Sequence, residues 1–463
     1  MTAVIRCLSP IDGSVCAERE AASPECVTAA LASARLAQAA WAETSLDERA
    51  RLCTAFVDAM LAMKADIVPE LARQMGRPVR YGGGELGGFE ERARHMIAIA
   101  AEALAPVVPA AKPGFQRMIK RTPLGVVMVI APWNYPFLTA VNSVVPALMA
   151  GNAVILKHAA QTLLVGERFQ MAADAAGLPD GLFRTLVLTH EATAKILGSR
   201  SVDQVNFTGS VAAGAAIEQA AAGTFIGVGL ELGGKDPGYV RADADLPFAV
   251  ENLVDGAFFN SGQSCCGIER IYVHADLYDE FVDKFVALTR TYVLGDPLDP
   301  ATTLGPMVRP AAADFVRGQI AEAVAAGARS LVDPAEFPRD AAGSAYMAPQ
   351  VLVGVDHSMR VMMEESFGPV IGIMKVVGDD EALALMNDSP YGLTASVWTR
   401  DAVAAEALGD RIATGTVFMN RCDYLDPALT WTGVKDTGRG ATLSRVGYET
   451  LTRPKSFHLR LGA

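Results

Sequence analysis

Apolar positions recur at helical spacing through the first hundred residues of the chain. Residues 25–41, "ECVTAALASARLAQAAW", carry them every three or four positions, which is typical of an amphipathic helix. Ser45 and Glu48 form a capping box ahead of a second such pattern at 49–71. We expect Pro69 to end or kink this second helix, because proline lacks the N–H that a helix interior needs.

A glycine cluster, "YGGGELGG", follows at 81–88. Because glycine is a poor helix former, we expect the cluster to interrupt the helical region before another helix at about 89–104.

From Gly125 the pattern changes to short, continuous apolar runs separated by helical segments. Such runs indicate parallel strands that are covered on both faces, as βαβ units produce. A second alternation begins near Asn252 and continues to about residue 420. We therefore predict an α/β fold with two doubly wound parallel-sheet lobes that join near residues 231–237. The runs of the first block are 125–132, 153–158, 182–188, 202–209 and 225–232.

Composition narrows the function classes. The formal net charge is −12 and no basic stretch occurs, so a nucleic-acid surface is not expected. The first residues lack an apolar signal core, and every apolar run is shorter than the roughly 20 residues that span a bilayer. Seven cysteines without CxxC or His-paired spacing predict neither a disulfide framework nor a metal site, and they favour a reducing cytoplasm.

Two adjacent cysteines, Cys265 and Cys266, follow a glycine-flanked turn in "FFNSGQSCCGIER". A free cysteine is more often a small buried apolar residue than a nucleophile, and spacing alone does not choose between the two. A serine hydrolase elbow is excluded, because GxSxG would need glycine at position 266.

The stretch "VNFTGSVAAG" has the layout of a strand, a turn and a helix start. Gly209, Ser210 and Gly214 would open the helix, whose N–H groups favour a pyrophosphate. A tight turn without a ligand explains the motif equally well, since it is neither a P-loop nor GxGxxG.

Five motifs together resemble the aldehyde dehydrogenase superfamily. They are "APWNYP" (131–136), "FTGS" (207–210), "LELGGK" (230–235), "NSGQSCC" (260–266) and "EESFGPV" (364–370), in the family's order. The resemblance covers nearly the whole chain. It implies a cofactor domain, a catalytic domain and a β-flap through which the chain forms a homodimer or homotetramer. The implied division is 1–104 with 124–233, then 234–436, and 105–123 with 437–463.

The resemblance also implies catalytic roles. Cys265 matches the family's nucleophile, whose thiolate adds to an aldehyde carbonyl, and Cys266 becomes a packed neighbour. Glu231 matches the general base, and Asn134 an oxyanion donor beside the Cys265 backbone N–H.

The implied cofactor is NAD or NADP. Gly209 and Ser210 would meet its pyrophosphate, Lys157 its adenosine ribose, and Glu365 and Phe367 its nicotinamide end. Ser366 stands where the family more often has isoleucine, which affects local packing. The remaining expected cofactor residues are Trp133, Gly214 and Ala160.

Ala160 stands where many NAD-preferring members carry glutamate. Because that carboxylate would repel a 2′-phosphate, its absence predicts that NADP is accepted. His158 could add positive charge there if it is protonated.

The substrate that the resemblance implies is a small aldehyde, and "KHAAQT" resembles the succinate-semialdehyde branch, whose substrates are anionic. Arg421 could hold a distal carboxylate as a bidentate fork, or it could pair internally with Asp423. The substrate residues that the resemblance implies are Tyr135, Leu138, Phe259, Arg421, Asp423, Tyr424 and Trp431.

Two rivals stay open. In a CoA-acylating variant a thiol would replace water as the final nucleophile, although Glu231 in its usual motif favours hydrolysis. A catalytically retired binding protein would be expected to lack Cys265, Glu231 or Asn134, and this chain retains all three.

Overall fold

The apolar runs that follow Gly125 form one six-stranded sheet in the computed structural model, which describes residues 3–461. Its order is β16-β8-β7-β4-β5-β6, and all neighbours are parallel except the short β16. Every residue of β4 and β5 is buried, as expected for central strands with helices on both faces. The strands are β4 (Val126–Ala131), β5 (Ala153–His158), β6 (Phe183–Thr185), β7 (Gln204–Thr208), β8 (Gly227–Glu231) and β16 (Gly438–Arg439).

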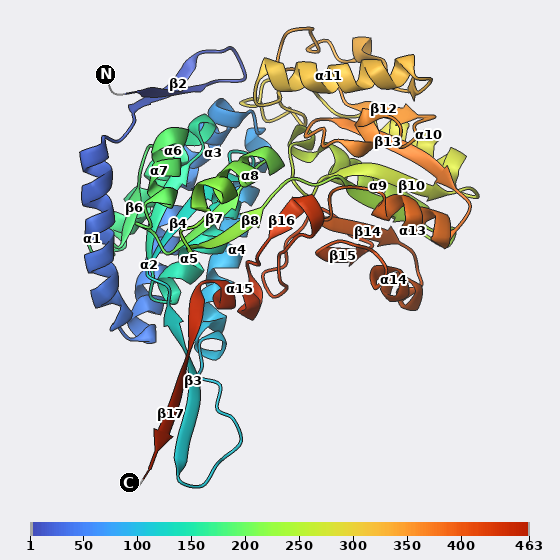
Figure 1. The fold of residues 1–463 in the computed structure, drawn as a ribbon. Helices are drawn as coiled ribbons and strands as arrows, with labels where there is room; N and C mark the ends of the chain where they lie inside the picture. Colours follow the sequence, from blue (N-terminus) through green and yellow to red (C-terminus); the bar gives the residue numbers. More distant parts are fainter. Residues whose placement is uncertain (1–2, 462–463) are drawn as a thin grey trace.

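Helices from both ends of the chain cover this sheet and share one apolar core with it (Figure 1). They are α1 (Pro24–Ala42), α2 (Leu46–Ala62), α3 (Lys64–Met75), α4 (Val79–Ala103), α5 (Pro136–Met149), α6 (Leu163–Ala175), α7 (His190–Gly198), α8 (Val211–Ala221) and α15 (Ser444–Thr450).

The predicted position of the first helix break is wrong. The side chain of Ser45 does cap α2, by accepting a hydrogen bond from the Glu48 N–H. However, α2 already ends at Ala62, and Pro69 lies inside α3. Because a new helix begins at Lys64, Pro69 falls within its first two turns.

The glycine cluster does not break the helix, since α4 runs through it without interruption. Its glycines make room for neighbouring helices. A Cβ on Gly82 would lie 2.8 Å from Val68 Cγ1 of α3, and a Cβ on Gly88 2.4 Å from Leu138 Cδ2 of α5. Close packing therefore outweighs the low intrinsic helix propensity of glycine.

The second lobe contains a seven-stranded sheet in the order β11-β12-β13-β10-β9-β14-β15, parallel except for β11. The predicted fold class, α/β with two parallel-sheet lobes, is thus confirmed. Its elements are β9 (Asp236–Val240), α9 (Leu246–Phe258), β10 (Ile268–His274), α10 (Tyr278–Thr289), α11 (Pro310–Ala325), β11 (Arg329–Ser330), β12 (Gln350–Val353), α12 (Arg360–Met363), β13 (Val370–Val376), α13 (Asp379–Asn387), β14 (Thr394–Trp398), α14 (Ala402–Gly409) and β15 (Thr416–Met419).

An antiparallel ribbon extends away from the two lobes (Figure 1). It pairs β3 (Phe115–Pro123) with β17 (Thr452–Arg460). In the sequence, β16 and α15 lie between the last strand of the second lobe and β17. Strand β16 joins the first sheet, and α15 packs on α4 and α5. A separate hairpin, β1 (Val4–Leu8) with β2 (Val15–Glu20), was not predicted from the pattern.

Candidate active site

Two adjoining cavities lie where strands of the first sheet end and face the second lobe. We call them the sheet-side cavity, about 530 Å³, and the helix-side cavity, about 370 Å³. Both are within the usual range for small-ligand sites. Thr208, Glu231 and Cys265 line both of them, so these three residues stand at their junction.

A left-handed turn presents Cys265 at this junction. Helix α9 ends at Phe258, and Asn260, Ser261 and Gly262 follow with φ of 53°, 57° and 70°. Glycine adopts such angles without strain, and a Cβ on Gly262 would lie 2.2 Å from the Gly368 carbonyl oxygen. The turn thus brings the chain against residue 368 before it reaches Cys265.

The two adjacent cysteines have different surroundings. Cys265 is partly exposed and lines both cavities, whereas Cys266 is buried. The Cys266 thiol donates to Asp423 Oδ1 at 3.1 Å, and Ser264 Oγ donates to the same oxygen at 2.7 Å. Its interaction with Cys265 and its burial raise the pKa of the Cys266 thiol well above its ordinary value. Cys266 is therefore held as a neutral donor.

Glu231 ends strand β8 and is held by two hydroxyl groups. Thr442 Oγ1 donates to Glu231 Oε1 at 2.5 Å, and Thr208 Oγ1 donates to Oε2 at 3.0 Å. Burial raises the pKa of Glu231, and the two hydroxyls oppose that shift by stabilising the carboxylate. The threonines were not singled out from the sequence, because Thr442 reaches the site only through the pairing of β16 with β8.

The double glycine after Glu231 permits two close approaches. A Cβ on Gly233 would lie 2.4 Å from the Glu365 carboxylate, and a Cβ on Gly234 2.5 Å from the Cys265 carbonyl oxygen. The Gly234 N–H donates to Glu365 Oε1 at 3.1 Å. Burial is the main cause that raises the pKa of Glu365 to about 8. The "LELGGK" motif therefore brings residues 231, 265 and 365 together.

A buried ion pair supports the loop that carries Glu365. Lys235 Nζ lies 2.5 Å from Glu269 Oε2 and donates to Ser366 Oγ at 3.0 Å. Glu269 also accepts the backbone N–H groups of Ser366 and Phe367. The serine that departs from the family pattern is thus a hydrogen-bond partner of Lys235, not a packing defect.

Asn134 is positioned by residues that sequence reasoning missed. Its side chain donates to the Gln263 carbonyl at 3.2 Å, and its own carbonyl accepts from Arg77 Nη2 at 2.5 Å. Arg77 forms a buried ion pair with Glu85, a residue of the glycine cluster. The only signal in the sequence was a charged residue amid glycines.

Comparisons with known proteins agree on one family. The sequence profile of the "Aldehyde dehydrogenase family" matches residues 2–457. An aldehyde dehydrogenase of Paenarthrobacter nicotinovorans is 36% identical over 460 residues, which cover 98% of this chain and 99% of that protein. The NADP(+) succinate-semialdehyde dehydrogenase 1 of Mycobacterium tuberculosis is 35% identical over 448 residues, 96% of this chain and 97% of that protein.

A solved structure of an NAD-dependent aldehyde dehydrogenase from Sinorhizobium meliloti superposes with a TM-score of 0.94 at 33% identity, covering 100% of this chain and 92% of the other. This chain belongs to the aldehyde dehydrogenase family. The expectation of an enzyme that oxidises aldehydes with NAD or NADP is thereby confirmed at the level of the family.

Five of the cofactor residues expected for an aldehyde dehydrogenase line the sheet-side cavity: Trp133, Gly209, Ser210, Glu365 and Phe367. The rings of Trp133 and Phe367 meet edge to face, with centroids 5.6 Å apart. Sequence reasoning missed further lining residues, among them Gln161, Arg309 and Phe315.

Three expected cofactor residues do not line this cavity. Lys157 is buried at the end of β5, where burial lowers its pKa, and Ala160 is exposed just beyond it. Gly214 packs against Leu232 instead, since a Cβ there would lie 2.6 Å from Leu232 Cδ2.

The suggestion that His158 adds positive charge is wrong. His158 is buried, and burial lowers its pKa to about 4, so the ring is neutral near pH 7. Its Nδ1 accepts from the Ala159 N–H and from Thr162 Oγ1, which leaves Nε2–H to donate to the Pro136 carbonyl.

The expected substrate residues divide in two groups. Arg421 does not line the helix-side cavity; it is exposed, with its guanidinium 3.6 Å from the centroid of the Tyr424 ring. The suggested pairing of Arg421 with Asp423 is wrong, because Asp423 accepts from Ser264 and Cys266 instead. Those that line the cavity are Tyr135, Leu138, Phe259, Asp423, Tyr424 and Trp431.

Helix α4 supplies much of the remaining cavity wall. Tyr81, Glu91 and Arg92 line it from this helix, and Asn142 lines it from α5. Their spacing on a helix gives no sign that they face a cavity, so sequence reasoning missed them.

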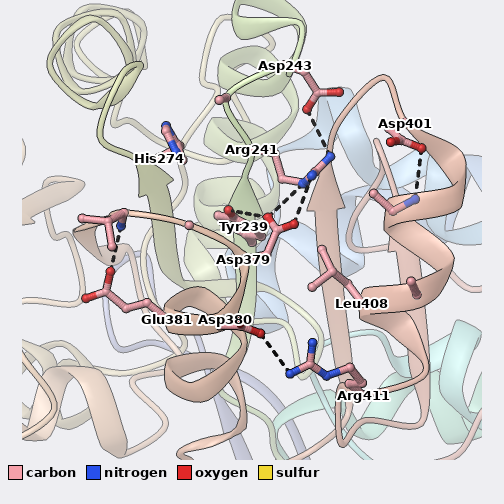
Figure 2. A pocket seen from close by; sticks show the side chains of 15 residues that line it. Tyr239, Arg241, Asp243, His274, Asp379, Asp380, Glu381, Asp401, Leu408 and Arg411 are labelled. Carbon is pink, nitrogen blue, oxygen red and sulfur yellow. Dashed lines mark hydrogen bonds and ion pairs between the residues drawn. The ribbon is translucent and has the colours of Figure 1, made fainter.

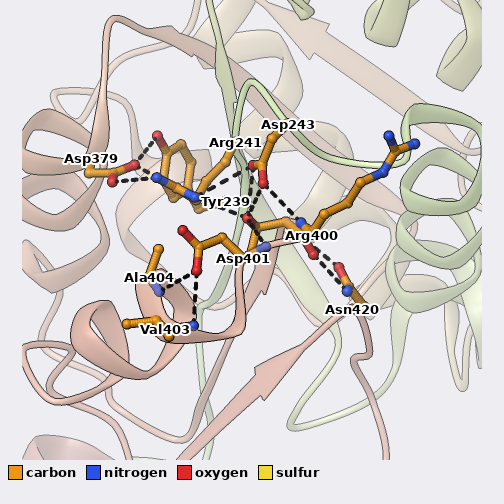
Figure 3. A network of polar contacts seen from close by, with 10 residues as sticks. Tyr239, Arg241, Asp243, Asp379, Arg400, Asp401, Val403, Ala404 and Asn420 are labelled. Atoms are coloured by element: carbon orange, nitrogen blue, oxygen red, sulfur yellow. Dashed lines mark hydrogen bonds and ion pairs between the residues drawn. The ribbon is translucent and has the colours of Figure 1, made fainter.

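A larger cavity, of about 950 Å³, lies at the carboxyl ends of β9 and β10 (Figure 2). Its charged groups bind one another. Arg241 Nε and Tyr239 OH each donate to Asp379 Oδ1 at 2.9 Å, while Asp243 accepts from the Thr399 hydroxyl (Figure 3). Asp401 caps α14. These contacts therefore hold α13 and α14 against the strands. None of the residues that line this cavity is a cysteine.

Residues 3–461 contain no cluster of three or more His, Cys, Asp or Glu side chains that could hold a metal ion. None of the helices in that range has the length and apolar character needed to cross a membrane.

Proposed function

We propose that this chain oxidises a small aldehyde to its carboxylic acid with NAD or NADP, with Cys265 as nucleophile, Asn134 as oxyanion donor and Glu231 as general base. The observation that supports it most directly is that Cys265 and Glu231 line both cavities. A reacting carbon at this junction would have its substrate chain in one cavity and its hydride acceptor in the other.

In the first step the Cys265 sulfur forms a bond to the aldehyde carbon, and the carbonyl oxygen takes up the negative charge. Asn134 has a second side-chain N–H, because only one is needed for the Gln263 carbonyl, and this N–H would stabilise the oxyanion together with the Cys265 backbone N–H. Loss of hydride from the carbon then leaves a thioester on Cys265.

Water releases the product. Glu231 takes a proton from a water molecule, whose oxygen attacks the thioester carbon, and the carbon–sulfur bond breaks to give the acid and the free thiolate. The raised pKa of Glu231 makes its carboxylate a stronger base than an exposed one.

The residues of the sheet-side cavity fit a dinucleotide. The backbone N–H groups in the first turn of α8 have no carbonyl partner within the helix, and no acidic residue lies in that turn. A pyrophosphate would therefore be favoured there. A bound NAD or NADP supplies the hydride acceptor. Gly209, Ser210, Glu365 and Phe367 would hold it, with Lys157 at the adenosine ribose.

We infer that NADP is accepted, because Ala160 places no carboxylate beyond Lys157. The NADP-dependent relative from Mycobacterium tuberculosis is consistent with this inference. Measuring kcat/KM with both cofactors tests this inference, and a preference for NAD of a hundredfold or more would refute it.

The decisive experiment follows NAD(P)H absorbance with a panel of aliphatic, aromatic, amino and carboxy aldehydes. We expect Cys265→Ala to lose activity by at least about 1000-fold, while Cys266→Ala retains most of it. Full activity in Cys265→Ala would refute the mechanism. Product analysis with and without CoA separates hydrolysis from acyl transfer. A CoA thioester as the main product would show that the CoA thiol, and not Glu231-activated water, attacks the thioester.

We also propose that the protein is a cytoplasmic homo-oligomer. The seven cysteines are all free, which suits a reducing compartment.

A further inference from the structure

Arg92 is a buried cation on the wall of the helix-side cavity that forms no ion pair within residues 3–461. Its side chain is 7% exposed. Two hydrogen bonds hold it, and both use Nη1: one goes to the Leu138 carbonyl at 2.8 Å and one to Asn142 Oδ1 at 3.3 Å. Within the described range, Nε and Nη2 have no hydrogen-bond partner.

A structural arginine elsewhere in the chain shows the contrast. Arg270 is also buried and has no ion pair among the described residues, but its three nitrogens donate to four backbone carbonyls. Within residues 3–461, Arg92 leaves its Nε–Nη2 edge without a partner. Neither nitrogen is fully buried, so both are open to the cavity that Arg92 lines. This edge is the fork that binds a carboxylate through two parallel hydrogen bonds.

The acidic side chains of the same cavity have other partners. Glu85 pairs with Arg77, Glu91 accepts from the Tyr424 hydroxyl, and Glu231 and Asp423 accept from hydroxyl and thiol groups. The remaining one, Asp255, is exposed, and desolvation, with the nearby charges of Asp423 and Glu251, raises its pKa to about 6. A buried cation without an ion-pair partner costs free energy. An anion that binds Arg92 in this cavity would therefore be stabilised.

We propose that Arg92 binds the carboxylate at the far end of a carboxy-substituted aldehyde while the aldehyde carbon meets Cys265, and that Asn142 orients the guanidinium. This inference rests on the proposed function and narrows its substrate class to semialdehydes. Asn142 acts as a positioning residue: its Oδ1 accepts from Nη1, and this contact turns the Nε–Nη2 edge toward the cavity.

The test compares two four-carbon substrates, succinate semialdehyde and its neutral counterpart butanal. We expect Arg92→Met to raise KM for succinate semialdehyde by about 10- to 100-fold and to change kcat/KM for butanal by less than about threefold. Arg92→Lys should recover part of the loss, because lysine keeps the charge without the fork.

The matched control is Arg94→Met on the same helix, where the arginine is partly exposed and pairs with Asp58 and Glu90. It should leave both substrates unchanged. Arg421→Met tests the other candidate, and a selective loss there instead of at Arg92 would overturn the inference. An equal loss for both substrates in Arg92→Met would also overturn it.

Two further readouts separate substrate binding from a structural or thiolate-stabilising role. The rate of Cys265 alkylation by iodoacetamide should keep its pH dependence in Arg92→Met, and a shifted profile would assign Arg92 to the thiolate instead. In the wild-type enzyme, succinate should inhibit butanal oxidation at least tenfold more strongly than succinamide does, which needs no variant to fold. Equal inhibition would refute a carboxylate site, whereas a chain that oxidises neither aldehyde would refute the proposed function itself.

Discussion

At the scale of single residues, neighbouring atoms decide which side chain can react. Cys265 and Cys266 are chemically identical in the sequence, but only Cys265 lines both cavities, whereas Cys266 lines the helix-side cavity alone and its thiol donates to Asp423. Glu231 is likewise an ordinary glutamate whose base strength depends on burial and on two threonine hydroxyls. Reactivity here is a property of the surroundings.

The Thr442 hydroxyl gives the first prediction. Thr442→Val removes a hydrogen bond that stabilises the Glu231 carboxylate, so the pKa of Glu231 should rise further. Because Glu231 acts in its deprotonated form, the rising acid limb of the pH profile of kcat should move to higher pH. Steady-state kinetics from pH 5 to about 9 measure this shift.

Thr432→Val is the matched control, since the Thr432 hydroxyl donates to the Gly440 carbonyl and not to Glu231. Its profile should coincide with that of the wild type. A Thr442→Val limb at unchanged or lower pH would contradict the assigned role of the hydroxyl.

At the scale of elements, Glu85 couples helix α4 to the start of helix α5. Its Oε1 accepts the backbone N–H groups of Phe137 and Leu138, at 2.9 and 3.0 Å, while its other oxygen pairs with Arg77. These amides belong to the unsatisfied first turn of α5, whose partial positive charge favours a carboxylate. Arg77 also donates to the Asn134 carbonyl. Through Arg77, Glu85 therefore supports the proposed oxyanion donor as well as the helix junction.

Glu85→Ala should therefore destabilise the fold strongly. Removing one partner of a buried ion pair leaves Arg77 uncompensated and two amides unbonded, at a cost of about 3 to 5 kcal/mol. The free energy of unfolding from urea titration measures this loss where the transition is two-state, and the melting temperature reports its direction otherwise.

Glu90→Ala on the same helix is the control, because Glu90 forms a partly exposed pair with Arg94 that contributes no more than about 1 kcal/mol. If the two variants lost similar stability, the coupling role of Glu85 would be wrong.

At the scale of the whole molecule, the β3–β17 ribbon has no further strand beside it within residues 3–461, apart from isolated bridges that join Val107 to Ile119 and Lys112 to Phe115. It forms a two-stranded sheet that extends away from both lobes (Figure 1). An isolated pair of strands is marginally stable, and its open edges invite another strand. Ile119 and Leu459 of this ribbon are exposed apolar residues. These features favour a contact with a second copy of the chain.

We expect the protein to be a dimer or tetramer and the ribbon to hold it together. Ile119→Asp combined with Leu459→Asp should reduce the native mass to that of a monomer, because burying two carboxylates in a contact is costly. Light scattering coupled to size-exclusion chromatography measures the mass.

Leu36→Asp provides the comparison, since Leu36 is an exposed apolar residue of α1, away from the ribbon. It should leave the mass unchanged. A wild-type monomer, or an oligomer that survives both ribbon substitutions, would contradict the prediction.

The sequence by itself determined the α/β class, most strands and the motif positions, because hydrophobic periodicity and turn chemistry are local properties. Tertiary structure decided what depends on distant neighbours. The glycine cluster is helical because α3 and α5 fill the space beside it, and Arg92 faces a cavity only because α4 packs on α5. Arg421 shows the reverse: its motif suggested a substrate contact, yet its exposed side chain lies against the Tyr424 ring and does not line the cavity. Burial and proximity between remote segments have no counterpart in local spacing, so they emerge only when the chain folds.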